Sequence, residues 1–380
     1  MKLIYLTSKS YPGRTADHNF VKNMAKTFSQ KLGEDFLFVG AKLDEEEFQG
    51  VNKLNLRLEK NKGRALFYFF WLPFFYFKRR NEGLIFFSND SYLILILIFW
   101  KKIFRLKYFI CSDWHQMFSD FRDKLMARGS DFLITTSDRL KKLLIEKTGV
   151  SGEKIITARG GADLKKFQIN SKSEIPSKRK MLGLPEDKKL VGYIGGFKTM
   201  GMDKGIGIMI KALKFLRSDF AMVFVGGKEK EIEEYKEIAE REKVSERVIF
   251  LEYQKEEKIA EYEEAMDILV IPYPDSLHFR EWGFPMKVYE YMASGTPIIY
   301  SDLDLINEVL KGRGLSFKPE DEKDLASKIN FLTENKSEGE KMTKEAKTSV
   351  KNFTWESRAE KILKFIIGNS DRSRSAQIFK

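Results

Sequence analysis

The stretch FPMKVYEYMASGTPIIYSD, residues Phe284–Asp302, carries the strongest structural signal in this sequence. Its pattern predicts a helix over Pro285–Ser294, a break at Gly295 and a short apolar strand over Thr296–Ser301. A helix that leads directly into such a strand is typical of proteins in which helices cover a parallel β-sheet.

The same alternation of strands and helices continues on both sides of this stretch. In the second half of the chain we predict strands at 189–196, 221–227, 247–253 and 268–273 and helices at 205–216, 229–243, 255–265 and 305–310. Toward the N-terminus we predict strands at 2–7, 35–40, 84–88, 107–112, 131–137 and 154–159 and helices at 20–30 and 138–147. This rhythm predicts an α/β fold with parallel sheets and helices on both faces.

A polar segment separates the two series of strands. Residues 169–179 (INSKSEIPSKR) include Pro176 and three serines, a composition typical of a linker. The fold class is therefore α/β with two doubly wound, Rossmann-like domains, in keeping with a chain of 380 residues. We expect an N-terminal domain at 1–168, a C-terminal domain at 169–354, an amphipathic helix at 355–368 and a disordered polar tail at 369–380.

The composition excludes certain classes of protein. Hydrophobic residues make up 43% of the chain, enough for real cores, so a largely disordered chain is excluded. A single cysteine, Cys111, excludes a disulfide scaffold and a multi-cysteine metal site. The three histidines, His18, His115 and His278, are too scattered for a histidine-rich metal motif. The first residues lack the long apolar segment of a signal peptide, so we expect a reduced, cytoplasmic compartment.

The positive charge lies in the first part of the chain. Residues 1–168 hold 30 Lys and Arg against 18 Asp and Glu, whereas residues 169–380 hold 37 of each kind. Two apolar runs in the first part, Ala65–Phe77 and Tyr92–Trp100, are flanked by cations and are too short to span a bilayer. They are either buried helices with solvated flanks or a surface that faces anionic lipid. Nucleic-acid binding is disfavoured, because the aromatic residues lie in apolar runs.

The residues around the predicted helix 285–294 suggest an anion site. A loop that enters a helix presents free backbone N–H groups and the positive end of the helix dipole. A diphosphate could bind there beside Lys287, and Glu290, one helical turn further on, could accept hydrogen bonds from both hydroxyls of a ribose.

This stretch resembles the signature of the GT-B glycosyltransferases, in particular the retaining family 4 group, also described as glycosyl transferases group 1. The pattern is Pro-x-Lys-x-x-Glu-Tyr-Met-Ala-x-Gly-x-Pro, and it is matched by Pro285, Lys287, Glu290, Tyr291, Met292, Ala293, Gly295 and Pro297. The resemblance implies the GT-B fold, in which two Rossmann-like domains face a central cleft and a C-terminal helix crosses back to the first domain.

The resemblance also implies a set of donor-binding residues. These are Gly195, Gly196, Lys198, Lys204, Gly226, Tyr253, Pro285, Met286, Lys287 and Glu290. The chain lacks the arginine that many members carry near Gly196, where Lys198 could substitute. Classical members also have a first glutamate eight positions before Glu290, where this chain has Trp282. Glu281 is one residue away, and His278 and Arg280 lie on the same predicted loop.

In the first domain, the resemblance points to the loop and helix at Ser10–Phe28 and to the strand end at Cys111–Phe118. It implies that Gly13 and His18 lie on the acceptor side. It further implies a catalytic role for His115, which follows a predicted strand, as ligand-binding residues in parallel sheets often do. Lys204 and Glu281 complete the expected catalytic residues.

The expected function is transfer of a sugar from a UDP- or GDP-linked donor to a glycan or lipid-linked glycan, with retention of configuration. We expect no cofactor and no metal, because lysines and a helix N-terminus can stabilise the leaving diphosphate and no Asp-x-Asp motif lies near the donor residues. A peripheral position on the inner face of the cell membrane is expected, without nucleic acid. A catalytically silent partner subunit or a sugar-nucleotide epimerase remains an alternative, and the oligomeric state stays open.

Overall fold

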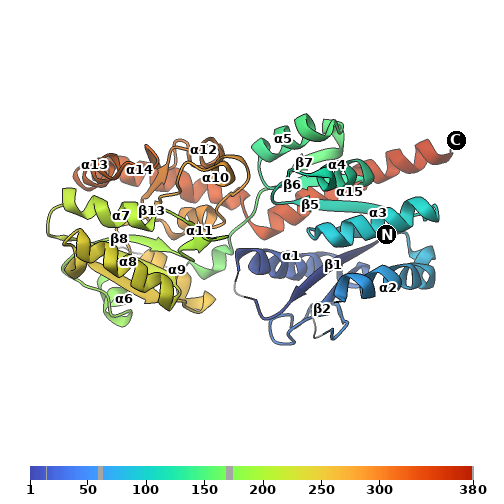
Figure 1. Ribbon diagram of the computed structural model, residues 1–380, viewed down its shortest axis with the longest axis horizontal. Coiled ribbons are helices and arrows are strands. Elements are labelled where there is room, and N and C mark those ends of the chain that lie inside the picture. Colours follow the sequence, from blue (N-terminus) through green and yellow to red (C-terminus); the bar gives the residue numbers. More distant parts are fainter. Residues whose placement is uncertain (14, 59–62, 168–173, 379–380) are drawn as a thin grey trace. The chain divides into compact units, whose positions relative to one another are not determined.

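The computed structural model describes residues 1–13, 15–58, 63–167 and 174–378 (Figure 1). The chain forms two compact units. Unit 1 consists of residues 1–160 and 355–380, and unit 2 consists of residues 161–354. The boundary expected at 168/169 lies outside the described residues.

Unit 1 is built on a seven-stranded sheet in the order β3-β2-β1-β4-β5-β6-β7. All neighbouring strands run parallel. The strands are β1 (Lys2–Ser10), β2 (Phe36–Lys42), β3 (Lys53–Asn55), β4 (Leu84–Ser88), β5 (Phe109–Trp114), β6 (Phe132–Thr135) and β7 (Ile155–Thr157). Aromatic residues fill the core: the buried ring of Tyr5 meets those of Phe38 and Phe87 edge-on at centroid distances of 5.4 and 4.9 Å.

Within the described part of unit 1, the α-helices that accompany this sheet are α1 (Ala16–Leu32), α2 (Arg64–Arg79), α3 (Ser91–Ile103), α4 (Phe121–Gly129), α5 (Asp138–Thr148) and α15 (Trp355–Ile378). Helix α15, drawn in red in Figure 1, packs on α1, where Lys31 forms an ion pair with Glu360 at 2.7 Å. It continues to Ile378, so the helix extends through most of the tail that we expected to be disordered.

The two apolar runs of the sequence form α2 and α3. Each helix buries one face and exposes the other: in α2, Leu72 is 3% exposed and Phe74 71%. Over the described ranges, no helix is both long enough and apolar enough to cross a membrane.

Unit 2 is built on a six-stranded parallel sheet in the order β12-β11-β8-β13-β14-β15. Its strands are β8 (Lys189–Ile194), β11 (Phe220–Gly227), β12 (Val248–Glu252), β13 (Ile268–Ile271), β14 (Ile298–Ser301) and β15 (Leu315–Phe317). A small hairpin of β9 (Lys198–Thr199) and β10 (Met202–Asp203) follows β8. The predicted doubly wound pattern is therefore confirmed.

The helices of unit 2 are α6 (Ile175–Met181), α7 (Ile206–Ala212), α8 (Glu229–Arg241), α9 (Glu256–Glu264), α10 (Leu277–Glu281), α11 (Lys287–Ser294), α12 (Asp304–Leu310), α13 (Glu322–Glu334) and α14 (Lys336–Ser349). The prediction of a linker over 169–179 is wrong for its second half, which begins α6. Arg179 there is buried, donates to the carbonyl of Ala265 at 2.8 Å and pairs with Asp267 at 2.8 Å. Residues 168–173 lie outside the description.

Candidate functional site

Two glycines bring the ends of β8 and β11 together in unit 2. Gly195 follows β8 with φ 130°, and Gly226 lies near the end of β11 with φ 108°. Both values fall in the region that favours glycine. A Cβ at Gly226 would lie 2.9 Å from the carbonyl carbon of Gly195. Because neither glycine has a side chain, the backbones of Gly195 and Gly226 can approach each other closely. The space beside Gly195 that a side chain would fill is left for a neighbouring group.

That neighbouring group is the amine of Lys287, the first residue of α11. A Cβ at Gly195 would lie 2.9 Å from Lys287 Nζ, which stands 3.3 Å from the ring centroid of Tyr193. Lys287 is 8% exposed, and its amine has no hydrogen-bond partner among the described residues. Burial lowers the pKa of Lys287 well below its usual range, and nearby Lys204 lowers it further. The site thus holds a buried amine without a hydrogen-bond partner among the described residues, while the charges of Glu263 and Glu290 partly oppose the fall in its pKa.

Lys204 contributes a second cation, immediately before α7. Burial lowers its pKa to about 8, against a small opposing effect of Glu231. Its backbone N–H donates to the carbonyl of Phe197 at 3.0 Å, which ties it to the turn after β8. Gly205, which follows, has φ 90°, and a Cβ there would lie 1.8 Å from the carbonyl oxygen of Pro272. The backbone around Lys204 is therefore fixed, and no other residue type fits at position 205.

Glu290 lies one helical turn after Lys287 on α11 and is partly exposed. Burial raises the pKa of Glu290 to about 7, against the effect of Lys166, and Glu256 raises it further. Lys166 itself pairs with Glu256 at 2.5 Å. A carboxylate that is partly protonated near neutral pH is poorly satisfied by the protein, so it is available to accept hydrogen bonds from a ligand.

Sequence reasoning did not identify Glu263 of α9. This side chain is fully buried, and neither carboxylate oxygen has a hydrogen-bond partner in the part of the chain that the structure describes. Burial raises its pKa, and the charge of Glu290 raises it further. Its surroundings in the sequence, AEYEEAMD, look like those of a solvent-exposed helix. No local pattern distinguishes Glu263 from its neighbours.

The other expected donor residues occupy different positions. Lys198 forms an ion pair with Glu234, so its amine is committed within the protein. The carbonyl of Gly196 accepts a hydrogen bond from the Tyr193 hydroxyl at 3.0 Å. Tyr253 directly follows β12 and is 50% exposed.

The segment before α11 is partly helical. Pro285 and Met286 directly precede α11, and Glu281 is the last residue of the short helix α10, which we had expected to be a loop. His278, on the same helix, accepts a hydrogen bond from the Trp282 indole at 3.1 Å. Burial lowers the pKa of His278, and Lys204 lowers it further. The structure therefore brings Gly195, Gly226, Lys204, Lys287 and Glu290 together.

In unit 1, His115 lies just beyond β5 between two carboxylates. Its Nε2 is 3.4 Å from Asp113 and its Nδ1 is 3.6 Å from Asp17. Burial alone would lower the pKa of His115, but the charge of Asp113 and the contacts with Asp17 outweigh it and raise the pKa to about 9. His115 is therefore protonated at neutral pH and can donate hydrogen bonds from both ring nitrogens.

A fully buried ion pair fixes Asp113. Arg358 of α15 contacts the two Asp113 oxygens at 2.6 and 2.8 Å, and both side chains have no exposed surface. The same guanidinium stands 4.7 Å from the ring centroid of Phe20, which in turn packs 4.2 Å from the ring of His115. The last helix of the chain thus holds the histidine in place through Asp113.

The acceptor-side residues predicted from the sequence lie at the start of α1. The His18 Nδ1 is 2.6 Å from the Thr15 hydroxyl, and a Cβ at Gly13 would overlap the His18 ring at 2.0 Å. Asp17, between these residues and His115, is bound by Lys9 at 2.7 Å and by Asn89 at 2.8 Å. Sequence reasoning missed Asp17, although it directly precedes His18.

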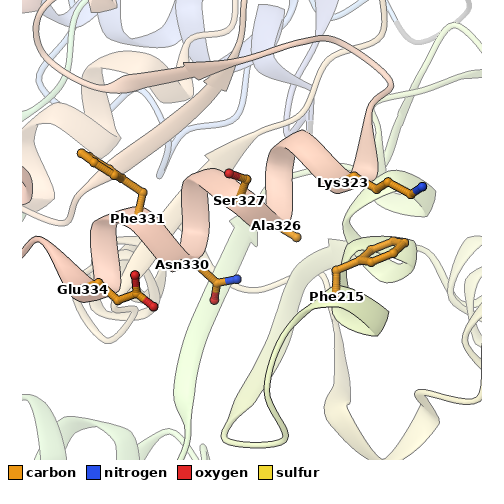
Figure 2. A pocket seen from close by; sticks show the side chains of 7 residues that line it. All are labelled: Phe215, Lys323, Ala326, Ser327, Asn330, Phe331 and Glu334. Atoms are coloured by element: carbon orange, nitrogen blue, oxygen red, sulfur yellow. The ribbon is translucent and has the colours of Figure 1, made fainter.

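No group of three or more His, Cys, Asp or Glu side chains is placed to hold a metal ion within the described ranges. A shallow hollow of about 580 Å³ lies elsewhere in unit 2, on α13 and the turn before β11. Figure 2 shows its lining, which includes Phe215, Lys323 and Phe331 and none of the predicted site residues.

Comparison with known proteins connects this geometry to a family. Residues 174–349 match the family model described as glycosyl transferases group 1. A D-inositol 3-phosphate glycosyltransferase of Nocardia farcinica is 23% identical over 253 residues, which cover 63% of this chain and 53% of that protein. The lipopolysaccharide core biosynthesis mannosyltransferase LpsB of Rhizobium meliloti is 30% identical over 196 residues, half of each chain. This chain spans about half the length of the curated relatives it matches.

Solved structures extend the similarity in fold over nearly the whole chain. HepE from Anabaena, solved in complex with UDP, superposes with a TM-score of 0.77 at 17% identity, covering 97% of this chain and 100% of that one. The two parallel sheets and their helices are those of that fold. The chain therefore has the GT-B fold, and its residues 174–349 are similar to the glycosyl transferases group 1 family.

Proposed function

We propose that this chain transfers a hexosyl group from a UDP- or GDP-linked sugar to a hydroxyl group of a glycan or lipid-linked glycan. One observation carries the donor part of this proposal: the buried amine of Lys287 has no hydrogen-bond partner among the described residues and points at the glycine turn of Gly195. A buried, unpaired cation is unfavourable unless a ligand supplies the missing charge. A diphosphate supplies that charge and also fits the backbone of a glycine turn.

The same cluster accounts for the departure of the leaving group. As the bond to the sugar breaks, negative charge accumulates on the diphosphate. Lys287, Lys204 and the backbone N–H groups at the start of α11 would stabilise that charge. Glu290 would accept hydrogen bonds from the ribose hydroxyls, and Tyr253, half exposed at the end of β12, would lie against the base. HepE, which was solved with UDP and with UDP-glucose, makes UDP the first nucleotide to test.

Unit 1 would hold the sugars. A protonated His115, fixed by Asp113 and Asp17, would place positive charge beside the transferred sugar. Gly13 and His18 would contact the acceptor. We propose that transfer proceeds with retention, that the leaving phosphate takes the acceptor proton, and that the lysines make a divalent metal unnecessary.

The acceptor side of the proposal places the protein at a membrane. The positive charge of residues 1–168 and the exposed aromatic residues of α2 and α3 support a peripheral position on the inner face of the cell membrane. There a lipid-linked acceptor would be within reach, as in the synthesis of a surface polysaccharide.

Calorimetric titration with UDP and GDP tests the donor site, and mass spectrometry of the products tests the reaction. Binding of one nucleotide, followed by transfer of sugar to an added acceptor, is the expected result. Binding without turnover on any acceptor would favour a silent partner subunit, and conversion of the nucleotide sugar into its epimer would favour an epimerase. If neither nucleotide bound, the assignment of the donor site would be wrong.

A further inference from the structure

Two helices of unit 1 expose a row of large apolar side chains. Along α2 the row runs with helical spacing, and Leu66, Phe70, Phe74 and Phe77 are 63, 64, 71 and 52% exposed. On the C-terminal half of α3 and just beyond it, the exposed residues are Phe99, Ile103 and Phe104, at 42, 55 and 55%. We name these seven residues the aromatic face. Exposed apolar clusters of this kind mark surfaces that contact a partner or a membrane.

Direct contacts join the two halves of the aromatic face. The Trp100 indole of α3 donates to the carbonyl of Phe69 in α2 at 2.8 Å. The ring of Phe69 lies 5.1 Å from that of Phe99 and 5.3 Å from that of Phe70, and Trp100 stacks on Phe104 at 5.0 Å. The exposed residues of α2 and α3 are therefore joined through Phe69 and Trp100, and Figure 1 shows the two helices as neighbours in unit 1.

Positive charge lies next to this surface, at the C-terminal ends of its two helices. Residues 63–107 contain eight Lys and Arg but only two acidic residues, Glu82 and Asp90. Five of the cations are exposed, and all lie at or beyond the C-terminal ends of α2 and α3: Lys78, Arg80, Lys102, Arg105 and Lys107. Asp90 is buried as the N-cap of α3, so it does not offset this charge at the surface.

We propose that the aromatic face docks on an anionic lipid bilayer, with α2 lying in the plane of the interface. Phenyl rings at the boundary between headgroups and acyl chains, with Lys and Arg reaching the anionic headgroups, form the usual arrangement of a surface-bound amphipathic helix. A second copy of this chain fits less well, because a two-fold pairing would bring the same positive residues of both copies together. Charge complementarity therefore favours lipid.

This inference deepens the membrane part of the proposed function but does not depend on the donor chemistry. The residues of the aromatic face lie in unit 1, whereas the donor residues Lys287 and Glu290 lie in unit 2. Vesicle binding and nucleotide binding can therefore be measured independently. A variant that loses one and keeps the other assigns each property to its own site.

The first test is co-sedimentation of the full chain with vesicles of phosphatidylcholine alone and with added phosphatidylglycerol. Binding is expected only to the anionic vesicles and is expected to weaken as salt rises. Replacing Phe70 and Phe74 with serine should lower the partition coefficient by about tenfold or more, since each ring loses its apolar contact with lipid. Replacing Lys78, Arg80 and Lys102 with glutamine should lower it by about fivefold per cation.

The matched control is Phe331→Ser in unit 2. Phe331 is 40% exposed on α13, and Figure 2 shows its side chain pointing away from that helix. It lies outside the positively charged region of residues 63–107. This variant should bind vesicles like the parent. All variants should keep the parent's UDP affinity, which shows that unit 2 is folded, and the parent's circular dichroism and thermal unfolding transition, which show that unit 1 is folded. Equal vesicle binding by the Phe70→Ser/Phe74→Ser variant and the parent would overturn the proposal.

A fluorescent label distinguishes lipid from a protein partner. The only cysteine, Cys111, is buried, so Phe74→Cys can be labelled selectively with an environment-sensitive dye. Anionic vesicles should shift its emission to the blue, and the same label at Phe331→Cys should not respond. A shift that appears with rising protein concentration and without vesicles, together with a dimer in sedimentation, would identify a second copy as the occupant and refute the lipid assignment.

Discussion

Replacing Lys287 with methionine is expected to stabilise unit 2 while removing most of its affinity for a nucleoside diphosphate. Methionine has nearly the same length and volume as lysine, so the space between Tyr193 and the Gly195 turn stays filled. The change removes a buried amine that has no hydrogen-bond partner among the described residues. The two effects have opposite signs because the amine is unsatisfied in the free protein and satisfied only by ligand.

The magnitudes follow from the burial of the amine. An unsatisfied buried polar group costs about 1–3 kcal/mol, so the free energy of unfolding of Lys287→Met should rise by about that amount. In a domain of 150–250 residues this corresponds to about 2–4 °C in Tm for each kcal/mol. Loss of a charged hydrogen bond to the diphosphate is worth about 1.5–3 kcal/mol, which weakens nucleotide binding by about 10- to 150-fold.

Thermal unfolding with and without UDP measures both effects in one series. Without nucleotide, the parent should have a lower Tm than Lys287→Met. When UDP is added, the Tm of the parent should rise by more than that of the variant. Lys323→Met is the control, because Lys323 is exposed beside Phe215 and should change neither quantity. A Lys287→Met protein that is less stable than the parent and binds UDP equally well would refute the reasoning.

Three further predictions concern pH, the buried ion pair and metal. Nucleotide affinity should be highest between about pH 7 and 8, because Glu290, with a pKa of about 7, must be ionised and Lys204, with a pKa of about 8, must be protonated. Calorimetric titrations across pH measure this dependence. In Glu290→Gln, the loss of affinity below pH 7 should disappear, and the loss above pH 8 should remain. Asp113→Asn should destabilise unit 1 by about 3–5 kcal/mol in denaturant titrations, because Arg358 loses its buried counter-ion. Arg358 holds the pKa of Asp113 down against burial, so the pair's contribution should persist at neutral pH and disappear on acidification. EDTA should leave transfer unchanged in a product assay, and strong inhibition would exclude the metal-free mechanism.

Local patterns predicted the strands well because most of them are apolar runs. The prediction of 84–88 coincides with β4, and that of 189–196 exceeds β8 by two residues. Helix α14 gave no such signal, since only Gly339 and Ala346 of its residues are fully buried. The segment at 175–181 looked like a linker because its stability comes from the distant partners of Arg179, which no window of sequence contains.

The residues of the candidate site also fall into those that local sequence predicts and those that only the fold brings together. Lys287 and Glu290 were predicted because they belong to a motif with fixed spacing, and Gly195 because its glycine turn follows a predicted strand; the structure brings the three together. Asp17 and Asp113 depend on contacts between separate strands and helices, so they emerged only from the fold. Lys198 was predicted to bind the donor, but the structure commits it to Glu234, a partner that its local sequence does not indicate.

The pairing of Asp113 with Arg358 has a consequence for synthesis on the ribosome. The two residues are 245 positions apart, so β5 and its neighbours are made long before the helix that neutralises Asp113 emerges. Unit 2, residues 161–354, is complete before that helix appears, whereas the core of unit 1 is not. We therefore expect unit 2 to complete its fold before unit 1, the reverse of the usual order of N-terminal domain first. A nascent chain stalled before Arg358 would carry every residue of the second unit and a first unit without the counter-ion of Asp113.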